Sequence, residues 1–133
     1  PIKSSAASDV YKRQIITSGI MVDETLKAYE QLQAEGIAVR VVDMFTWKPL
    51  DEELVVKCAV ETGAIVTAEN HNVTCGLGSV VSNCLAKNCP TVQEFVGVQD
   101  LFGQVGPQDF LMDEYGLRAA NIVAAVKKAI SRK

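Results

Sequence analysis

The sequence predicts an α/β fold in which a mainly parallel β-sheet is covered by helices on both faces. Two observations lead to this class. From Ile15 onward, short apolar runs alternate with amphipathic stretches of helical periodicity. The connections between them are only a few residues long, which is typical of strand–helix–strand units in a parallel sheet.

Four strands are expected. The residues Ile15–Thr17 form the end of a buried strand before Ser18-Gly19. The stretches at 37–44, 64–69 and 91–98 are apolar and rich in β-branched residues, and turn or helix-stop residues flank them. Each is long enough for one strand of a buried sheet.

Helical stretches follow each of these strands. The first helix begins near Val22 and ends at Gly36, and the second has Asp51 as its N-cap and ends at Gly63. The third places Leu77, Val80, Val81, Cys84, Leu85 and Asn88 on one face and ends at Cys89-Pro90.

The chain becomes purely helical after the fourth strand. Gly106-Pro107 opens a short helix with proline at its first position, and Gly116 ends it. A terminal helix then carries Ile122, Val123, Val126 and Ile130 on its inner face. Together these elements predict a Rossmann-like three-layer sandwich.

Composition agrees with one globular domain, because apolar residues make up 48% and charged residues 22% of the 133 residues. The net charge is −3, without the basic stripe that nucleic-acid binding needs. We therefore expect no nucleic-acid partner.

Apolar runs are too short to span a membrane, so no membrane partner and a cytoplasmic location are expected. The four cysteines are expected to be reduced.

The first fourteen residues, PIKSSAASDVYKRQ, show neither helical nor strand periodicity. Part of this leader resembles translated adapter or vector sequence. We therefore expect residues 1–14 to be a non-native leader and residues 15–133 to be the domain.

The edge where parallel strands end usually binds ligands or partners. In this sequence the edge carries 18–19, 45–49, 69–78 and 98–106. The stretch ENHNVTCGLGS concentrates Glu69, His71, Cys75 and two glycines, Gly76 and Gly78. Gly76 and Gly78 before a helix permit a dinucleotide site, but Val81 replaces the third glycine of that motif. Close packing of the helix on its strand is the alternative.

His71 also permits other chemistries. With Cys75 it could form a base–thiol pair, and with Cys75, Cys84 and Cys89 a zinc set, although the spacing argues against zinc and no third residue orients a hydrolase. A structural or interface role is the alternative for a lone histidine.

Glu69 ends a buried strand, and three roles stay open for it: an ion pair, hydrogen bonds to N–H groups such as those of 76–78, or contact with a partner. Trp47 and Phe102 are large aromatic residues in edge loops, which is typical of a covered contact surface. Trp47 could equally cap the core. Glu69, His71, Gly76, Gly78, Trp47 and Phe102 are the candidate interface and edge-loop residues.

Three segments occur in the order known for one family: TSGIMVDETLKAYEQLQAEGIAVRVVDMFTWKPLDEE, IVTAENHNVTCGLGSVV and GVQDLFGQVGPQDFLMDEYGL. They resemble the C-terminal domain of transketolase, particularly the form split into N- and C-terminal subunits. The resemblance runs from about Ile15 to the end. Deoxyxylulose-phosphate synthase and the β subunits of 2-oxo acid dehydrogenases share the fold, and the GVQD…GPQD block favours transketolase.

The resemblance implies that the intact enzyme transfers a two-carbon ketol unit between sugar phosphates on thiamine diphosphate with Mg²⁺. It implies that other domains, absent from this chain, hold the cofactor and metal. No catalytic, cofactor-binding or metal residue is expected here. The partners implied are the N-terminal and middle transketolase domains or subunit, in a homodimer or heterotetramer, and this chain alone should be inactive.

The sequence departs from the family's pattern at two positions. Cys75 stands where a glycine is common, which argues further against a thiol role. Arg118 stands where a small hydroxyl residue commonly opens the last helix, which should weaken that cap by about 1 kcal/mol or less.

Overall fold

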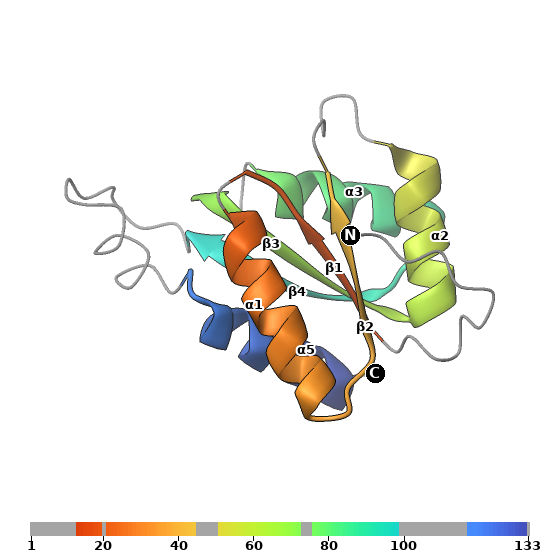
Figure 1. Cartoon of the computed structure of the whole chain (residues 1–133). Coiled ribbons are helices and arrows are strands. Elements are labelled where there is room, and N and C mark those ends of the chain that lie inside the picture. The colour runs from red at the N-terminus through yellow and green to blue at the C-terminus, as the bar shows by residue number, and fades with distance from the viewer. Residues whose placement is uncertain (1–12, 20, 45–50, 73–75, 99–116, 133) are drawn as a thin grey trace.

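The computed structural model describes residues 13–19, 21–44, 51–72, 76–98 and 117–132, with the backbone alone at 70–72 and 98. The sheet contains β1 (Arg13–Thr17), β2 (Val39–Asp43), β3 (Ala64–Asn72) and β4 (Val92–Val98). Its order is β2-β1-β3-β4, and all three pairings are parallel (Figure 1). The predicted parallel sheet is confirmed.

Four helices are described: α1 (Met21–Ala34), α2 (Glu52–Thr62), α3 (Leu77–Asn88) and α5 (Ala119–Arg132). Helices α1 and α5 cover one face of the sheet, and α2 and α3 cover the other (Figure 1). The three-layer α/β fold is therefore confirmed. The short helix predicted after Gly106-Pro107 lies outside the described residues.

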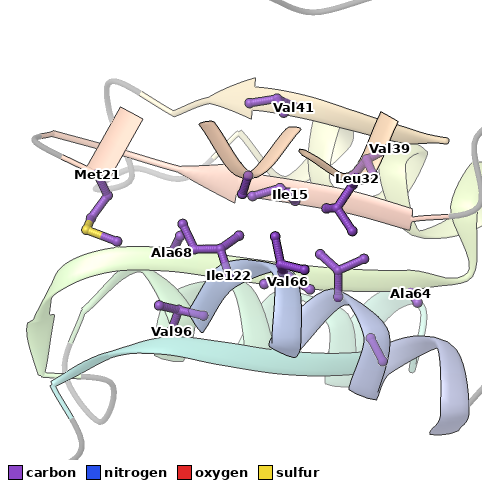
Figure 2. Close-up of a cluster of buried hydrophobic side chains, with 14 of the residues drawn as sticks. Ile15, Met21, Leu32, Val39, Val41, Ala64, Val66, Ala68, Val96 and Ile122 are labelled. Carbon is purple, nitrogen blue, oxygen red and sulfur yellow. The ribbon is translucent and has the colours of Figure 1, made fainter. Parts of the chain in front are cut away.

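Both faces of the sheet are apolar because successive strand residues point to opposite sides. Ile15 and Val66 belong to the cluster beneath α1 and α5, which Figure 2 shows, whereas Ile16 and Ile65 belong to the cluster beneath α2 and α3. All four are fully buried. This double burial explains why the strands read as continuous apolar runs rather than as alternating patterns.

Local signals set the bounds of α2 as predicted. Asp51 accepts a hydrogen bond at 3.1 Å from the backbone N–H of Leu54, and thereby caps the helix N-terminus. Gly63 ends the helix with a left-handed φ of 74°, which glycine adopts without steric cost.

The first strand, whose end was predicted at Thr17, also includes Arg13 and Gln14, which the sequence assigned to the leader. Gln14 is fully buried, and its amide oxygen accepts a hydrogen bond from Arg40 Nε at 2.7 Å. Its amide nitrogen donates to the Arg40 carbonyl at 3.0 Å. Pairing of its polar atoms lets this polar residue occupy a central strand. Residues 1–12 lie outside the described residues, and the foreign origin of the leader stays a prediction.

Candidate functional site

The carboxyl edge of the sheet has a switch point between β1 and β3. These strands are neighbours, but the chain leaves β1 for α1 on one face and leaves β3 for α3 on the other. In open parallel sheets this is the usual place for ligand or partner contacts. Of the candidate residues, the structure describes Glu69, Gly76 and Gly78 together with the residues around them.

The remaining candidates are described less fully. His71 lies in β3, two residues after Glu69, and its backbone position is all that is described. Trp47, Cys75 and Phe102 lie outside the described residues. The interface role of all of these residues therefore stays a prediction.

Glu69 is fully buried and holds the start of α3. Its Oε1 accepts a hydrogen bond from Leu77 N at 2.6 Å, and its Oε2 accepts one from Gly78 N at 2.6 Å. Of the three roles that the sequence left open, the structure shows hydrogen bonding to the N–H groups of this helix. A carboxylate in this position also complements the positive end of the helix dipole.

Gly78 is held at both of its backbone polar groups. Its carbonyl accepts a hydrogen bond at 3.0 Å from Gln93 Nε2, which also donates to Thr67 Oγ1 at 3.2 Å. Glu69, Gln93 and Thr67 thus join α3 to β3 and β4, and we call these three residues the α3 clamp. Sequence reasoning missed Gln93, because nothing in its local pattern separates a bridging glutamine from an exposed one.

Gly78 must be glycine for steric reasons. A Cβ at this position would lie 2.7 Å from Phe95 Cδ2, 2.9 Å from Glu69 Oε2 and 3.0 Å from Thr67 Oγ1. Real Cβ atoms essentially never come within 3.0 Å of another atom, so the Phe95 and Glu69 side chains would have to move. Close packing of helix on strand, the alternative to a dinucleotide motif, is the arrangement seen.

The start of α3 does not fit a phosphate group. A helix N-terminus binds anions through its free N–H groups, but Glu69 already accepts the bonds of two of them. A diphosphate would also meet the negative carboxylate. Within the described residues, moreover, there is no group of three or more His, Cys, Asp or Glu side chains suited to a metal. The start of α3 therefore does not fit the diphosphate group of thiamine diphosphate.

A second buried carboxylate lies at the start of α5. Glu24 of α1 accepts a hydrogen bond from Ala119 N at 2.9 Å and one from Lys27 Nζ at 3.0 Å. Burial alone would raise the pKa of Glu24, but these hydrogen bonds, with the charges of Lys27 and Arg118, outweigh it and lower the pKa. The carboxylate is thus held in its charged form.

The cysteines that the structure describes are free thiols. Cys58 and Cys84 are buried, and burial raises the pKa of both thiols, which opposes thiolate formation. Cys84 lies on the core side of α3, as expected, with its Sγ 3.9 Å from the carbonyl oxygen of Glu52. It is therefore placed as a core residue.

Three basic residues of α5 form ion pairs with two glutamates outside the helix. Lys127 pairs with Glu35 at 2.7 Å, and both Lys128, at 3.6 Å, and Arg132 pair with Glu94. These contacts hold α5 to α1 and β4. No membrane-spanning helix is found in the parts of the chain that the structure describes.

These features define a Rossmann-like α/β domain in which the Glu69 carboxylate accepts the hydrogen bonds of backbone N–H groups at the start of α3. The chain belongs to the family of transketolase C-terminal domains: the family model described as "Transketolase, C-terminal domain" matches residues 7–122. The resemblance drawn from the three sequence segments is confirmed.

Two curated relatives illustrate the range of similarity. A protein described as 6-deoxy-6-sulfo-D-fructose transketolase subunit SqwH, from Clostridium sp. (strain MSTE9), is 48% identical over 119 residues, covering 90% of this chain and 37% of that protein. A 1-deoxy-D-xylulose-5-phosphate synthase from Heliobacterium modesticaldum is 36% identical over 115 residues, covering 86% of this chain and 18% of that protein.

A solved structure described as "Split gene transketolase, inactive beta4 tetramer" superposes with a TM-score of 0.85 at 49% identity. The match covers 90% of this chain and 39% of that one. The chain therefore spans between about a fifth and two fifths of the relatives that it matches.

Proposed function

We propose that this chain serves as the C-terminal domain of a split-type transketolase that transfers a two-carbon ketol unit between sugar phosphates. The observation that carries this proposal is the 49% identity and TM-score of 0.85 to a split-gene transketolase. The family match over residues 7–122 supports it. The chemistry belongs to the whole enzyme, of which this chain is a part.

The proposed role of the domain is assembly. Thiamine diphosphate and Mg²⁺, which supply the carbanion chemistry of transketolases, would be held by the other domains. The start of α3 supports this assignment of the cofactor to other domains, because its Leu77 and Gly78 N–H groups already donate to Glu69 and are not free for a diphosphate. His71, Gly76, Trp47 and Phe102 stay candidates for the edge that meets those domains.

The proposed partners are the N-terminal and middle transketolase domains, in a homodimer or heterotetramer. The SqwH relative is described as a subunit, and the solved relative is described as a tetramer. A cytoplasmic location agrees with sugar-phosphate substrates.

A second candidate function has its own support. The synthase from Heliobacterium modesticaldum, at 36% identity, keeps deoxyxylulose-phosphate synthesis open as the reaction of the whole enzyme. The β subunit of a 2-oxo acid dehydrogenase and a free-standing interaction module are the further alternatives. The residues that separate these reactions would lie in domains outside this chain.

A domain exchange tests the proposal. Residues 13–133, which include the whole of β1, replace the aligned region of the Clostridium SqwH subunit, and the chimera is mixed with its partner subunit, thiamine diphosphate and Mg²⁺. We expect ketol transfer from a ketose phosphate to an aldose phosphate. A chimera that binds the partner subunit but restores no ketol transfer would contradict the proposal.

The isolated chain is the matched control. We expect no turnover from it under the same conditions, because it lacks the proposed cofactor-binding domains. Turnover by the isolated chain comparable to that of the chimera would contradict the proposed role in assembly.

A further inference from the structure

The attachment of α3 to the sheet does not use the residue that precedes the helix. Gly76 occupies the N-cap position and contributes no side-chain hydrogen bond. The helix start is held instead by Glu69, eight residues before Leu77 and nine before Gly78. An ordinary cap stabilises a helix locally, whereas this one fixes the helix to the strand that precedes it.

The α3 clamp restrains one point of the helix from three sides. Glu69 and Thr67 come from β3, and Gln93 comes from β4. Glu69 accepts the N–H of Gly78, and Gln93, which also donates to Thr67, donates to the Gly78 carbonyl, while the Cα side of Gly78 faces the Phe95 ring. The first turn of α3 therefore cannot shift along or away from the sheet without breaking buried hydrogen bonds.

We propose that Glu69 is a positioning residue, and that its carboxylate fixes the first turn of α3 and so sets the carboxyl edge of β3 for contact with the cofactor-binding part of the enzyme. This inference rests on the function proposed above. The strand continues past Glu69 to Asn72 and includes His71, so this part of the edge and the helix start have one common anchor.

The remainder of α3 is held by other contacts. Val81, Cys84 and Leu85 pack with residues of α2 and the sheet in the apolar core. Loss of the Glu69 carboxylate should therefore release the first turn while the helix stays docked. This separation makes the positioning role distinguishable from a general role in folding.

The first test uses Glu69→Gln in the chimera described above. Glutamine has nearly the same size, but it offers one acceptor oxygen, and its NH₂ group faces the second N–H as donor against donor. The partner subunit is titrated into each chimera and the initial rate is measured. We expect about tenfold more partner at half-maximal rate, with kcat at saturation changed less than about twofold.

Glu61→Gln is the matched control. Glu61 is a partly buried carboxylate paired with Arg40 at 2.5 Å, and it lies at the C-terminal end of α2, at the opposite edge of the sheet. The Glu61→Gln substitution should lower thermal stability without moving the midpoint of the partner titration. An equal shift in both variants would mean that general destabilisation explains the effect, and would overturn the proposal.

The second test restores the missing group. Glu69→Ala in the same chimera is titrated with partner in sodium formate or in sodium chloride at equal concentration. Formate supplies a free carboxylate for the N–H groups of Leu77 and Gly78, so we expect it to lower the titration midpoint. In the 133-residue chain, Glu69→Ala should make the amide hydrogens of Leu77 and Gly78 exchange faster than in the unsubstituted chain. Formate should slow this exchange again.

The outcomes separate the two proposals. If the unsubstituted chimera fails to work with the partner, the proposed function fails and the inference fails with it. If the chimera works and Glu69→Gln exchanges faster at Leu77 and Gly78 but binds partner equally well, Glu69 is a cap only. In that case the positioning role is wrong and the proposed function stands.

Discussion

Glu24 Oε1 accepts the backbone N–H of Ala119 at 2.9 Å, although the two residues are 95 positions apart. The contact replaces a missing local cap, because Arg118 stands where a small hydroxyl residue was expected to open this helix. The Arg118 N–H donates to Asn121 Oδ1 at 2.9 Å, and its guanidinium lies 4.0 Å from Glu24. The start of α5 is thus held by α1 as well as by its own first turn.

Removal of this carboxylate should destabilise the domain. We expect Glu24→Ala to lower the free energy of unfolding by about 1–3 kcal/mol, because the N–H of Ala119 would lose a partly buried, charged acceptor. Urea denaturation of the purified chain measures the change. Glu35→Ala, which removes an exposed partner of Lys127, should cost much less, because exposed ion pairs contribute little to stability. Equal losses in the two variants would contradict the capping role.

The same contact should depend on pH. The pKa of Glu24 is lowered in the folded chain, so its stabilisation is complete above the ordinary glutamate value of 4.5. The stabilisation by Glu24 should decrease as the pH falls below 4.5 towards the lowered pKa of Glu24 in the folded chain. We therefore expect the difference in unfolding free energy between the unsubstituted chain and Glu24→Gln to be constant near neutral pH and to shrink below about pH 4.5. A difference that grew on acidification would have the wrong sign.

Gly78→Ala should destabilise the α3 attachment. The added methyl group would improve helix propensity by up to about 1 kcal/mol, but it would crowd two buried groups, Glu69 Oε2 at 2.9 Å and Thr67 Oγ1 at 3.0 Å. Phe95 is partly exposed and can turn aside. We expect a net loss of about 1–3 kcal/mol, measured by thermal denaturation. Asn83→Ala on the exposed face of α3 should change stability by less than about 0.5 kcal/mol, and a similar loss there would argue against crowding.

The thiols should differ in reactivity. Cys58 and Cys84 are buried and their pKa values are raised, whereas Cys89 is partly exposed. Iodoacetamide should therefore modify Cys89 before the other two in the folded chain, as read by peptide mass spectrometry. In urea the three rates should converge. Fast modification of Cys84 in the native chain would contradict its place in the core.

The sequence permits more than one role for His71, including a base–thiol pair and an interface contact. If it lies at the partner-facing edge, His71→Ala in the chimera should raise the partner concentration needed for half-maximal rate before it lowers kcat. Titration of the partner subunit separates the two parameters. Unchanged assembly with abolished turnover would instead make His71 a catalytic residue.

Local signals predicted much of the fold. The capping aspartate at 51 and the left-handed glycine at 63 act within one turn of α2, so adjacent residues suffice to identify them. The apolar runs of β2, β3 and β4 reveal strands because both faces of the sheet are covered. No local signal marked the start of β1, because Arg13 and Gln14 look like surface residues; the partner of Gln14 is Arg40, on the neighbouring strand.

By itself, the sequence determined the alternation of strands and helices, the family and the position of the carboxyl edge. These depend on periodicity and on residues close together in the chain. Tertiary structure alone decided the roles of Glu24, Glu69 and Gln93. Each is a polar side chain whose partner lies on another element, and whether it is solvated or buried depends on which backbone group folding brings within hydrogen-bond distance.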